Sequence, residues 1–140
     1  GDPRTEYPFY LGHADEQGHG AGLGYNLNLP LPVGTGFARW MQAVEQGMAQ
    51  VRAFAPQALV VSLGLDTYGN DPIAGFTLQT ADYPVLGAAI RALDLPTVMI
   101  LEGGYAAAEL GNNVVAVLRG ALAPREAVDV LMQRGARTEH

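Results

Sequence analysis

The sequence of 140 residues contains no cysteine. This absence excludes disulfides, thiolate nucleophiles and thiolate-rich metal sites, so carboxylates and imidazoles remain as the strong metal ligands. It also fits a cytoplasmic protein. No apolar run approaches the roughly 18 to 20 residues of a membrane span, and the first residues lack the charged-then-apolar form of a signal peptide. We therefore expect a soluble protein that has no membrane partner.

Positive charge is also scarce, because 8 lysine and arginine residues stand against 14 aspartate and glutamate residues, for a formal net charge of -6. The arginines are scattered, so no basic surface for direct nucleic-acid binding is expected. A length of 140 residues with 49% hydrophobic content suits one globular domain and no second domain. The chain begins with Gly1 in the irregular stretch GDPRTEYPFY. From this beginning we expect it to be part of a larger protein.

Hydrophobic periodicity predicts alternating strands and helices. We expect a loop over residues 1–24, strands over 25–30, 58–63 and 97–101, helices from the N-cap Thr35 to Pro56, over 80–93 and from 107 or 110 to 122, and a short helical piece over 124–130. The unbroken apolar run at 58–63 predicts a central strand that is covered on both faces. The apolar residues at 114, 115, 117, 118 and 122 are expected to form the buried face of the last long helix. Residues 134–140 are expected to be frayed.

This order of elements is typical of an α/β fold in which helices flank a parallel sheet. Three strands make a narrow sheet, so we expect an incomplete fold whose other strands lie upstream of Gly1. An open strand edge and exposed apolar surface favour self-association, and we therefore expect a homo-oligomer.

Ligands in such folds collect at the carboxyl ends of the parallel strands. The stretch SLGLDTYGNDPIAGF places Asp66 and Asp71 directly after the strand predicted at 58–63. A carboxylate there needs a cation, a metal or several backbone donors, because its burial without a partner is costly. Alternatively, both aspartates cap turns, a role that this residue type often fills. The pattern leaves both interpretations open.

The stretch EGGY follows the strand predicted at 97–101. Its paired glycines allow a tight turn that presents Tyr105 toward the neighbouring strand end. A phenol with a pKa of about 10 stays protonated at neutral pH and can donate a hydrogen bond to a developing oxyanion. The alternative is that Tyr105 is an aromatic at the rim that packs on the glycines. Glu102 is expected to be a solvated or capping acid.

Other chemical motifs are not favoured. The glycine cluster at positions 18, 20, 22 and 24 precedes its strand, so it indicates a flexible loop and not a phosphate-binding loop. His13, His19 and His140 show no metal-ligand spacing, and Ser62 lacks the flanking glycines of a nucleophile elbow.

SLGLDTYGNDPIAGF followed by TVMILEGGY resembles the histone deacetylase superfamily, and GDPRTEYPFYLGHADE before GLGYNLNLPLPVGTG resembles its acetylpolyamine amidohydrolase branch. The resemblance extends from Gly1 to about Leu122. It implies an arginase-like α/β fold and a zinc-dependent amidohydrolase, in which a zinc-bound water attacks the acetyl amide of an acetylated polyamine or of acetyl-lysine. By this resemblance Asp66 corresponds to a zinc ligand and Tyr105 to the tyrosine that polarises the carbonyl.

The same resemblance assigns further roles by position. The substrate channel would be lined by Tyr7 or Phe9, with Ile73 and Gly104 near the pocket. Tyr25 matches a residue near a structural site for a monovalent cation, for which potassium is the expected ion. Asp71, together with Pro72, would brace the loop that holds Asp66.

The sequence departs from the family at one point, because the D-x-H strand end and the histidine pair of these enzymes precede the position where this chain starts. A catalytic zinc keeps three protein ligands. We therefore expect the chain to be the C-terminal portion of such an enzyme, inactive alone and binding zinc weakly or not at all. One alternative is a non-catalytic α/β interaction module that retains the fold, and a more distant one is an unrelated domain that binds a small molecule.

Overall fold

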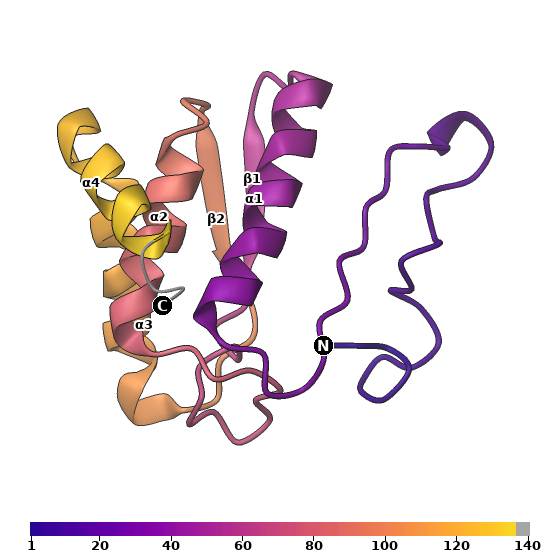
Figure 1. The fold of residues 1–140 in the computed structure, drawn as a ribbon, viewed down its shortest axis with the longest axis horizontal. Coiled ribbons are helices and arrows are strands. Elements are labelled where there is room, and N and C mark those ends of the chain that lie inside the picture. Colours follow the sequence, from indigo (N-terminus) through magenta and orange to yellow (C-terminus); the bar gives the residue numbers. More distant parts are fainter. Residues whose placement is uncertain (137–140) are drawn as a thin grey trace.

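The computed structural model describes residues 1–136 as an irregular N-terminal segment followed by helices packed around parallel strands (Figure 1). The elements in chain order are η1 (Gly20–Gly22), α1 (Phe37–Phe54), β1 (Leu59–Leu63), η2 (Thr80–Asp82), α2 (Tyr83–Arg91), β2 (Thr97–Leu101), α3 (Ala107–Ala121) and α4 (Arg125–Ala136). The predicted α/β class, with parallel strands and flanking helices, is confirmed. Within the described residues, no helix has both the length and the apolarity needed to cross a membrane.

The sheet consists of β1 and β2, which pair in parallel from Leu59 opposite Thr97 to Leu63 opposite Leu101. Leu59, Val61 and Met99 pack against the apolar core on one face. On the other face Val60 is 65% exposed, and Val98 is 59% exposed. The prediction of a central strand covered on both faces is therefore wrong for the described part of the chain, because the helices there cover only one face of the sheet.

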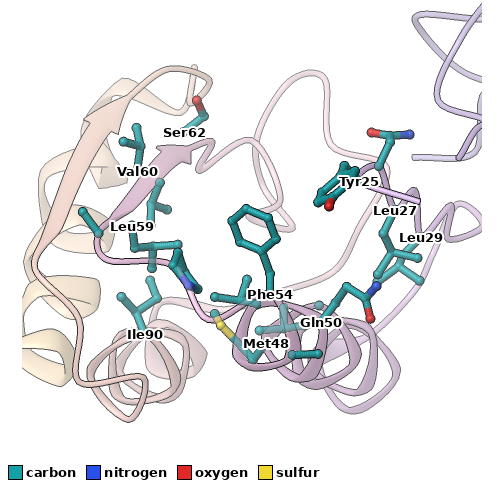
Figure 2. A pocket seen from close by; sticks show the side chains of 18 of the residues that line it. Tyr25, Leu27, Leu29, Met48, Gln50, Phe54, Leu59, Val60, Ser62 and Ile90 are labelled. Carbon is teal, nitrogen blue, oxygen red and sulfur yellow. The ribbon is translucent and has the colours of Figure 1, made fainter. Parts of the chain in front are cut away.

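Residues 25–30 form no strand, so the prediction of a first strand is wrong. The segment is extended, and Leu27 and Leu29 line one wall of a groove whose other walls are α1 and β1 (Figure 2). The alternating leucines therefore reflect one apolar side of an extended segment that has no ladder partner among residues 1–136. The predicted loop over residues 1–24 is interrupted only by η1 and projects to one side of the helices (Figure 1).

The start of α1 also differs from the prediction. The N-cap is Gly36, and the hydroxyl of Thr35 instead donates a hydrogen bond to the Pro32 carbonyl at 2.6 Å. The Thr35 carbonyl accepts the amide of Thr77 at 3.1 Å. Thr35 is therefore part of the packing between two loops and does not cap α1. The helix ends before Pro56, as predicted.

The later elements follow the prediction closely. β2 has the predicted bounds, and the region 80–93 folds as η2 followed by α2, with Pro84 in the first turn of α2. The short helical piece is longer than predicted, because α4 continues to Ala136. The fraying predicted from residue 134 is therefore wrong up to 136, and residues 137–140, which include His140, lie outside the described residues.

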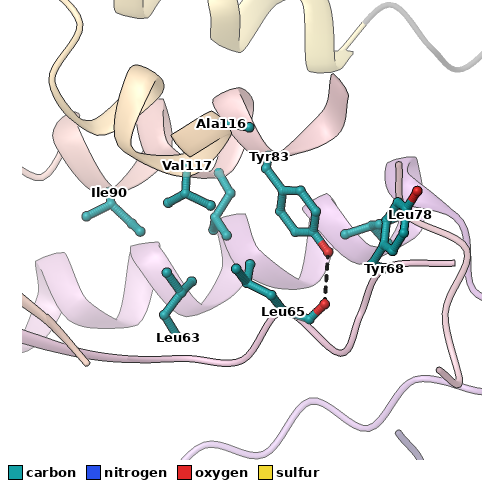
Figure 3. Packing of buried hydrophobic residues seen from close by; sticks show 9 residues of the cluster. Leu63, Leu65, Tyr68, Leu78, Tyr83, Ile90, Ala116 and Val117 are labelled. Atoms are coloured by element: carbon teal, nitrogen blue, oxygen red, sulfur yellow. Dashed lines mark hydrogen bonds between the residues drawn. The ribbon is translucent and has the colours of Figure 1, made fainter. Parts of the chain in front are cut away.

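The core lies between the sheet and the helices α2 and α3 (Figure 3). Leu65, Leu78, Tyr83 and Val117 are fully buried in it. Leu65 and Leu78 come from the connection between β1 and α2, so this loop is part of the folded core.

The face of α3 that packs on α2 agrees with the prediction only in part. Val117 is buried and Val114 packs against the core, as predicted, whereas Val115, Leu118 and Leu122 are exposed. The other buried positions of α3 are Asn113, Ala116 and Gly120. A Cβ at Gly120 would collide with the Pro84 carbonyl oxygen and lie 2.7 Å from the amide nitrogen of Ala88. A Cβ at Gly87 would lie 2.7 Å from the amide nitrogen of Ala121. The two glycines let the helix backbones touch, and larger residues on this face would separate them.

We predict that Gly120→Ala destabilises the protein by roughly 1–3 kcal/mol, because the added methyl group overpacks a contact between two backbones. Gly111→Ala, on the same helix, is the matched control. No atom lies within 4 Å of the position that its Cβ would take, so the higher helix propensity of alanine should stabilise the protein by about 0.5–1 kcal/mol. Urea unfolding measures both changes. Stabilisation by both substitutions would contradict the close approach of α2 and α3.

Candidate functional site

The two strand-end loops are joined by backbone hydrogen bonds that continue beyond the strands. The amide of Glu102 donates to the Leu63 carbonyl at 3.1 Å, and the amide of Leu65 donates to the Gly103 carbonyl at 2.7 Å. The carboxyl ends of parallel strands lie at one edge of the sheet. The loop that carries Asp66 and the loop that carries Tyr105 therefore start side by side.

The Asp66 carboxylate lies over Gly103 on the neighbouring loop. A Cβ built at Gly103 would stand 2.7 Å from the carboxylate carbon of Asp66, and one built at Gly64 would stand 2.9 Å from Oδ1. Gly103 has no positive φ, so glycine is needed at this position for space and not for backbone freedom. The sequence suggested a tight turn at these glycines, whereas the structure shows that Gly103 also makes room for an acid 37 positions earlier.

Tyr83, at the start of α2, anchors the loop after β1 through hydrogen bonds of its hydroxyl group. The Tyr83 hydroxyl shares a hydrogen bond of 3.0 Å with the Thr67 hydroxyl. It also donates to the Leu65 carbonyl at 3.5 Å (Figure 3). Burial raises the pKa of Tyr83 to about 12, so the phenol remains a hydrogen-bond donor. The only sequence signal for this role is a tyrosine among the apolar residues of the helix.

Asp71 connects the two loops through its carboxylate, which is almost completely buried. Oδ2 accepts the amide of Tyr105 at 2.6 Å and the amide of Ala106 at 3.0 Å, and Oδ1 accepts the amide of Ile73 at 3.1 Å. Burial raises the pKa of Asp71, but the three backbone hydrogen bonds, led by that of Tyr105, outweigh it and hold the pKa below its usual value. The sequence pattern gave no sign of the link to Tyr105, because the two residues are 34 positions apart.

Tyr105 lies between the glycine pair and α3. Its side chain is 57% exposed, whereas its backbone amide is held by Asp71. Gly104 precedes it with φ of +139°, a conformation that other residues rarely adopt. A Cβ there would also stand 2.7 Å from the Leu110 Cδ1. The phenol therefore projects from a backbone that is fixed on both sides.

Besides Gly104, the residues predicted for the substrate channel lie on two neighbouring segments. Ile73 is exposed on the loop after β1, and Tyr7 and Phe9 are exposed on the N-terminal segment. These segments meet where the Glu6 carboxylate fills the space beside Gly75, since a Cβ there would be 2.5 Å from Oε1. Tyr7 therefore follows directly on Glu6, the residue that contacts the loop of Ile73 at Gly75.

Tyr25 lies elsewhere, on the wall of the groove beside α1. Its ring meets that of Phe54 edge-on, with 5.7 Å between centroids (Figure 2). This groove, of about 1060 Å³, is lined by the N-terminal segment, α1, β1 and α2. None of its lining residues is Asp66, Asp71 or Tyr105, so the large hollow and the candidate chemistry are at different places.

The donor set of this chain does not complete a zinc site. Among residues 1–136, no three histidine, aspartate or glutamate residues are grouped so that they could hold a metal. A catalytic zinc needs three protein ligands, and Asp66 would supply one. His13 and His19 lie on the irregular N-terminal segment. We therefore derive no chemical step through a metal from these residues.

The fold and the two strand-end loops define an α/β protein with a polar site at the edge of a parallel sheet. A family model described as histone deacetylase domain matches residues 1–121. The chain belongs to the histone deacetylase family, as the sequence resemblance predicted.

Several relatives are similar over most of the chain. It is 52% identical over 120 residues to acetylpolyamine amidohydrolase 2 of Pseudomonas aeruginosa and 42% identical over 120 residues to acetylpolyamine amidohydrolase of Mycoplana ramosa, with 86% of this chain and 35% of each relative covered. A crystal structure of acetylpolyamine aminohydrolase from Burkholderia pseudomallei is 44% identical, with a TM-score of 0.84 over 86% of this chain and 35% of that one. The chain thus spans about a third of the length of these relatives.

We predict that the contribution of Asp71 to stability depends on pH. The folded-state pKa of Asp71 lies below the usual value of an aspartate, so the ionised carboxylate stabilises the fold above that usual value, and this stabilisation is lost as the pH falls through the folded pKa. At pH 6, Asp71→Asn should lower the free energy of unfolding by about 1.5–3 kcal/mol, as expected for charged hydrogen bonds. The difference in the free energy of unfolding between wild type and Asp71→Asn should narrow as the pH falls below about 4.

Asp82→Asn is the control with the opposite sign. Burial raises the pKa of Asp82, although its hydrogen bond from the Gln79 amide acts against this, so the wild-type fold gains stability as this residue is protonated. The stability of the wild type relative to Asp82→Asn should therefore rise in acid, and not fall. Urea unfolding at several pH values measures both pairs, and an Asp71 difference that stays constant down to pH 2 would refute the prediction.

Proposed function

We propose that this chain is the C-terminal portion of a zinc-dependent amidohydrolase that hydrolyses acetyl amides to acetate and a free amine. The observation that carries the proposal is the pairing of Asp66 and Tyr105 on adjacent strand-end loops, which the Leu65 to Gly103 hydrogen bond joins. It is supported by the deacetylase family and by relatives whose names describe acetylpolyamine amidohydrolases.

Each residue has a stated role in the proposal. Asp66 would contribute one carboxylate ligand to zinc, and the remaining ligands would come from residues outside this chain. Tyr105 would donate its phenolic proton in a hydrogen bond to the amide oxygen, where negative charge develops as water adds to the carbonyl. The channel for the acyl chain would run past Tyr7 or Phe9 and Ile73, near Gly104.

The proposed substrate is an acetylated polyamine, because this is the compound class in the names of the relatives. Acetyl-lysine is the second substrate class, which the histone deacetylase family model favours. A potassium site near Tyr25 and a cytoplasmic location also remain proposals. Metal analysis of the purified enzyme and cell fractionation test them.

We predict that a full-length protein containing this chain releases acetate from an N-acetylated diamine when it is supplied with zinc. Tyr105→Phe should lower kcat by roughly 10²–10³-fold, the effect of removing one oxyanion donor. Asp66→Asn should lower both zinc content and activity. The 140-residue chain alone should be inactive and should retain no zinc on gel filtration.

Asp94→Asn is the matched control for Asp66→Asn. Asp94 is exposed and pairs with Arg91 and Arg125 on the helical side of the molecule, so its variant should keep wild-type activity. If the folded, zinc-loaded full-length protein releases no acetate, the catalytic proposal fails. The alternative would then be a non-catalytic α/β interaction module, a second candidate that is favoured by the lack of a complete metal-ligand group among residues 1–136.

We also propose that the chain made alone self-associates through the free edge of β1. The Leu59 amide donates to the Pro96 carbonyl and the Leu63 carbonyl accepts the Glu102 amide, so both groups face the β2 side. Because successive residues of a strand direct their backbone N–H and C=O groups to opposite edges, those of Val60 and Ser62 face the free edge. The chain exposes 8726 Å², whereas a folded monomer of 14.8 kDa is expected to expose roughly 7,000 Å². The surplus is about 1,700 Å² per chain, roughly twice the 800 Å² that each partner buries in a standard interface.

Light scattering after gel filtration tests this proposal. We predict a mass of at least twice the 14.8 kDa of one chain. Val60→Lys should shift the population toward the monomer, because a charge at a strand edge opposes pairing. Val115→Lys, at an exposed position of α3, should leave the mass unchanged. A wild-type chain that is monomeric at every concentration would contradict the proposal.

A further inference from the structure

We propose that Asp71 is a positioning residue for Tyr105, and that its carboxylate sets the place of the phenol in the active site. This inference rests on the proposed function, because it assigns Asp71 a role through the proposed hydrogen-bond donor. It differs from the expectation that Asp71 only braces its own loop around Asp66.

The geometry divides the carboxylate between the two loops. Oδ1 bonds the amide of Ile73 within its own loop at 3.1 Å, whereas Oδ2 bonds the amides of Tyr105 and Ala106 at 2.6 and 3.0 Å. Hydrogen bonds to an ionised acceptor are shorter and stronger than those between neutral groups. Two of the three bonds therefore act on the loop of Tyr105.

Tyr105 depends on this support, because the backbone hydrogen bonds that join its loop to the neighbouring strand end involve Glu102 and Gly103 and not Tyr105 itself. Gly103 and Gly104 precede it and restrict the backbone less than other residues would. α3 begins at Ala107, and its N-cap Ala106 has no side chain that can cap the helix. Within the described residues, the structure records no hydrogen bond or ring contact of the Tyr105 side chain. Asp71 thus holds the two residues that precede α3 from a distant part of the chain and fixes the backbone from which the phenol projects.

The position of the phenol matters for the proposed chemistry. A donor that stabilises charge only in the transition state must be held within about 0.5 Å of the productive place. A displacement of about 1 Å can cost roughly 10²-fold in rate. A shift in the backbone at Tyr105 would therefore lower kcat while substrate binding is largely kept.

A double-mutant cycle in the full-length, zinc-loaded enzyme tests the inference, with kcat and KM measured on an N-acetylated diamine. We expect Asp71→Asn to lower kcat roughly 10- to 100-fold, with KM changed by less than about threefold. In the Tyr105→Phe background the same substitution should change kcat by less than about twofold, because the donor that it would displace is gone. This loss of effect would support positioning through Tyr105.

Other outcomes overturn the inference. Equal losses of kcat in both backgrounds, or an Asp71→Asn enzyme with wild-type kcat, would show that Asp71 does not act through Tyr105. A wild-type kcat in Tyr105→Phe alone would instead refute the role of Tyr105 in the proposed function, so the two failures can be told apart.

Two further variants control for folding. Asp82→Asn removes another carboxylate that accepts a backbone amide, that of Gln79 at 2.8 Å, and should leave kcat within about twofold in both backgrounds. If Asp71→Asn does not fold, Asp71→Glu takes its place in the cycle, because it keeps the charge and displaces it by one methylene group. The same dependence on Tyr105 is then expected, and its absence would overturn the inference.

Discussion

The in-register parallel pairing of β1 with β2 is the interaction on which the candidate site depends. Because the strands run in the same direction, their loops leave from one edge of the sheet, and the Leu65 to Gly103 hydrogen bond carries the pairing into the loops. Asp71 then adds a charged link between them. Without the pairing, Asp66 and Tyr105 would be ordinary loop residues 39 positions apart in sequence.

Glycines allow close backbone contacts, and these contacts hold the other elements in place. Gly87 and Gly120 let α2 and α3 touch near the C-terminal end of α3. Gly103 leaves the space that the Asp66 carboxylate fills. The opposite face of the sheet and the outer edge of β1 are uncovered in the described residues. This one-sided burial agrees with a chain that matches about a third of the length of its relatives.

The sequence predicted the α/β class, the bounds of β2 and the order of helices, because those signals come from local periodicity and proline placement. It failed at residues 25–30, since an alternating pattern shows one apolar side but does not show whether a partner strand exists. On α3 it was right for Val117, which is buried, but wrong for Leu118 and Leu122, which are exposed because the face toward α2 is set by close backbone contact at Gly120. For the candidate site, Asp66 and Tyr105 could be named from their loops, but the link from Asp71 to the Tyr105 amide could not, because it is a tertiary contact.

Asp71 ties the loop of Tyr105 to the loop of Asp66. Hydrogen exchange of individual backbone amides, followed by NMR in wild type and Asp71→Asn, tests this link most directly. Loss of a charged hydrogen bond worth about 1.5–3 kcal/mol predicts that the amides of Tyr105 and Ala106 exchange roughly 10- to 100-fold faster, while amides in the middle of α1 change much less. Unchanged exchange at Tyr105 and Ala106 would contradict the account.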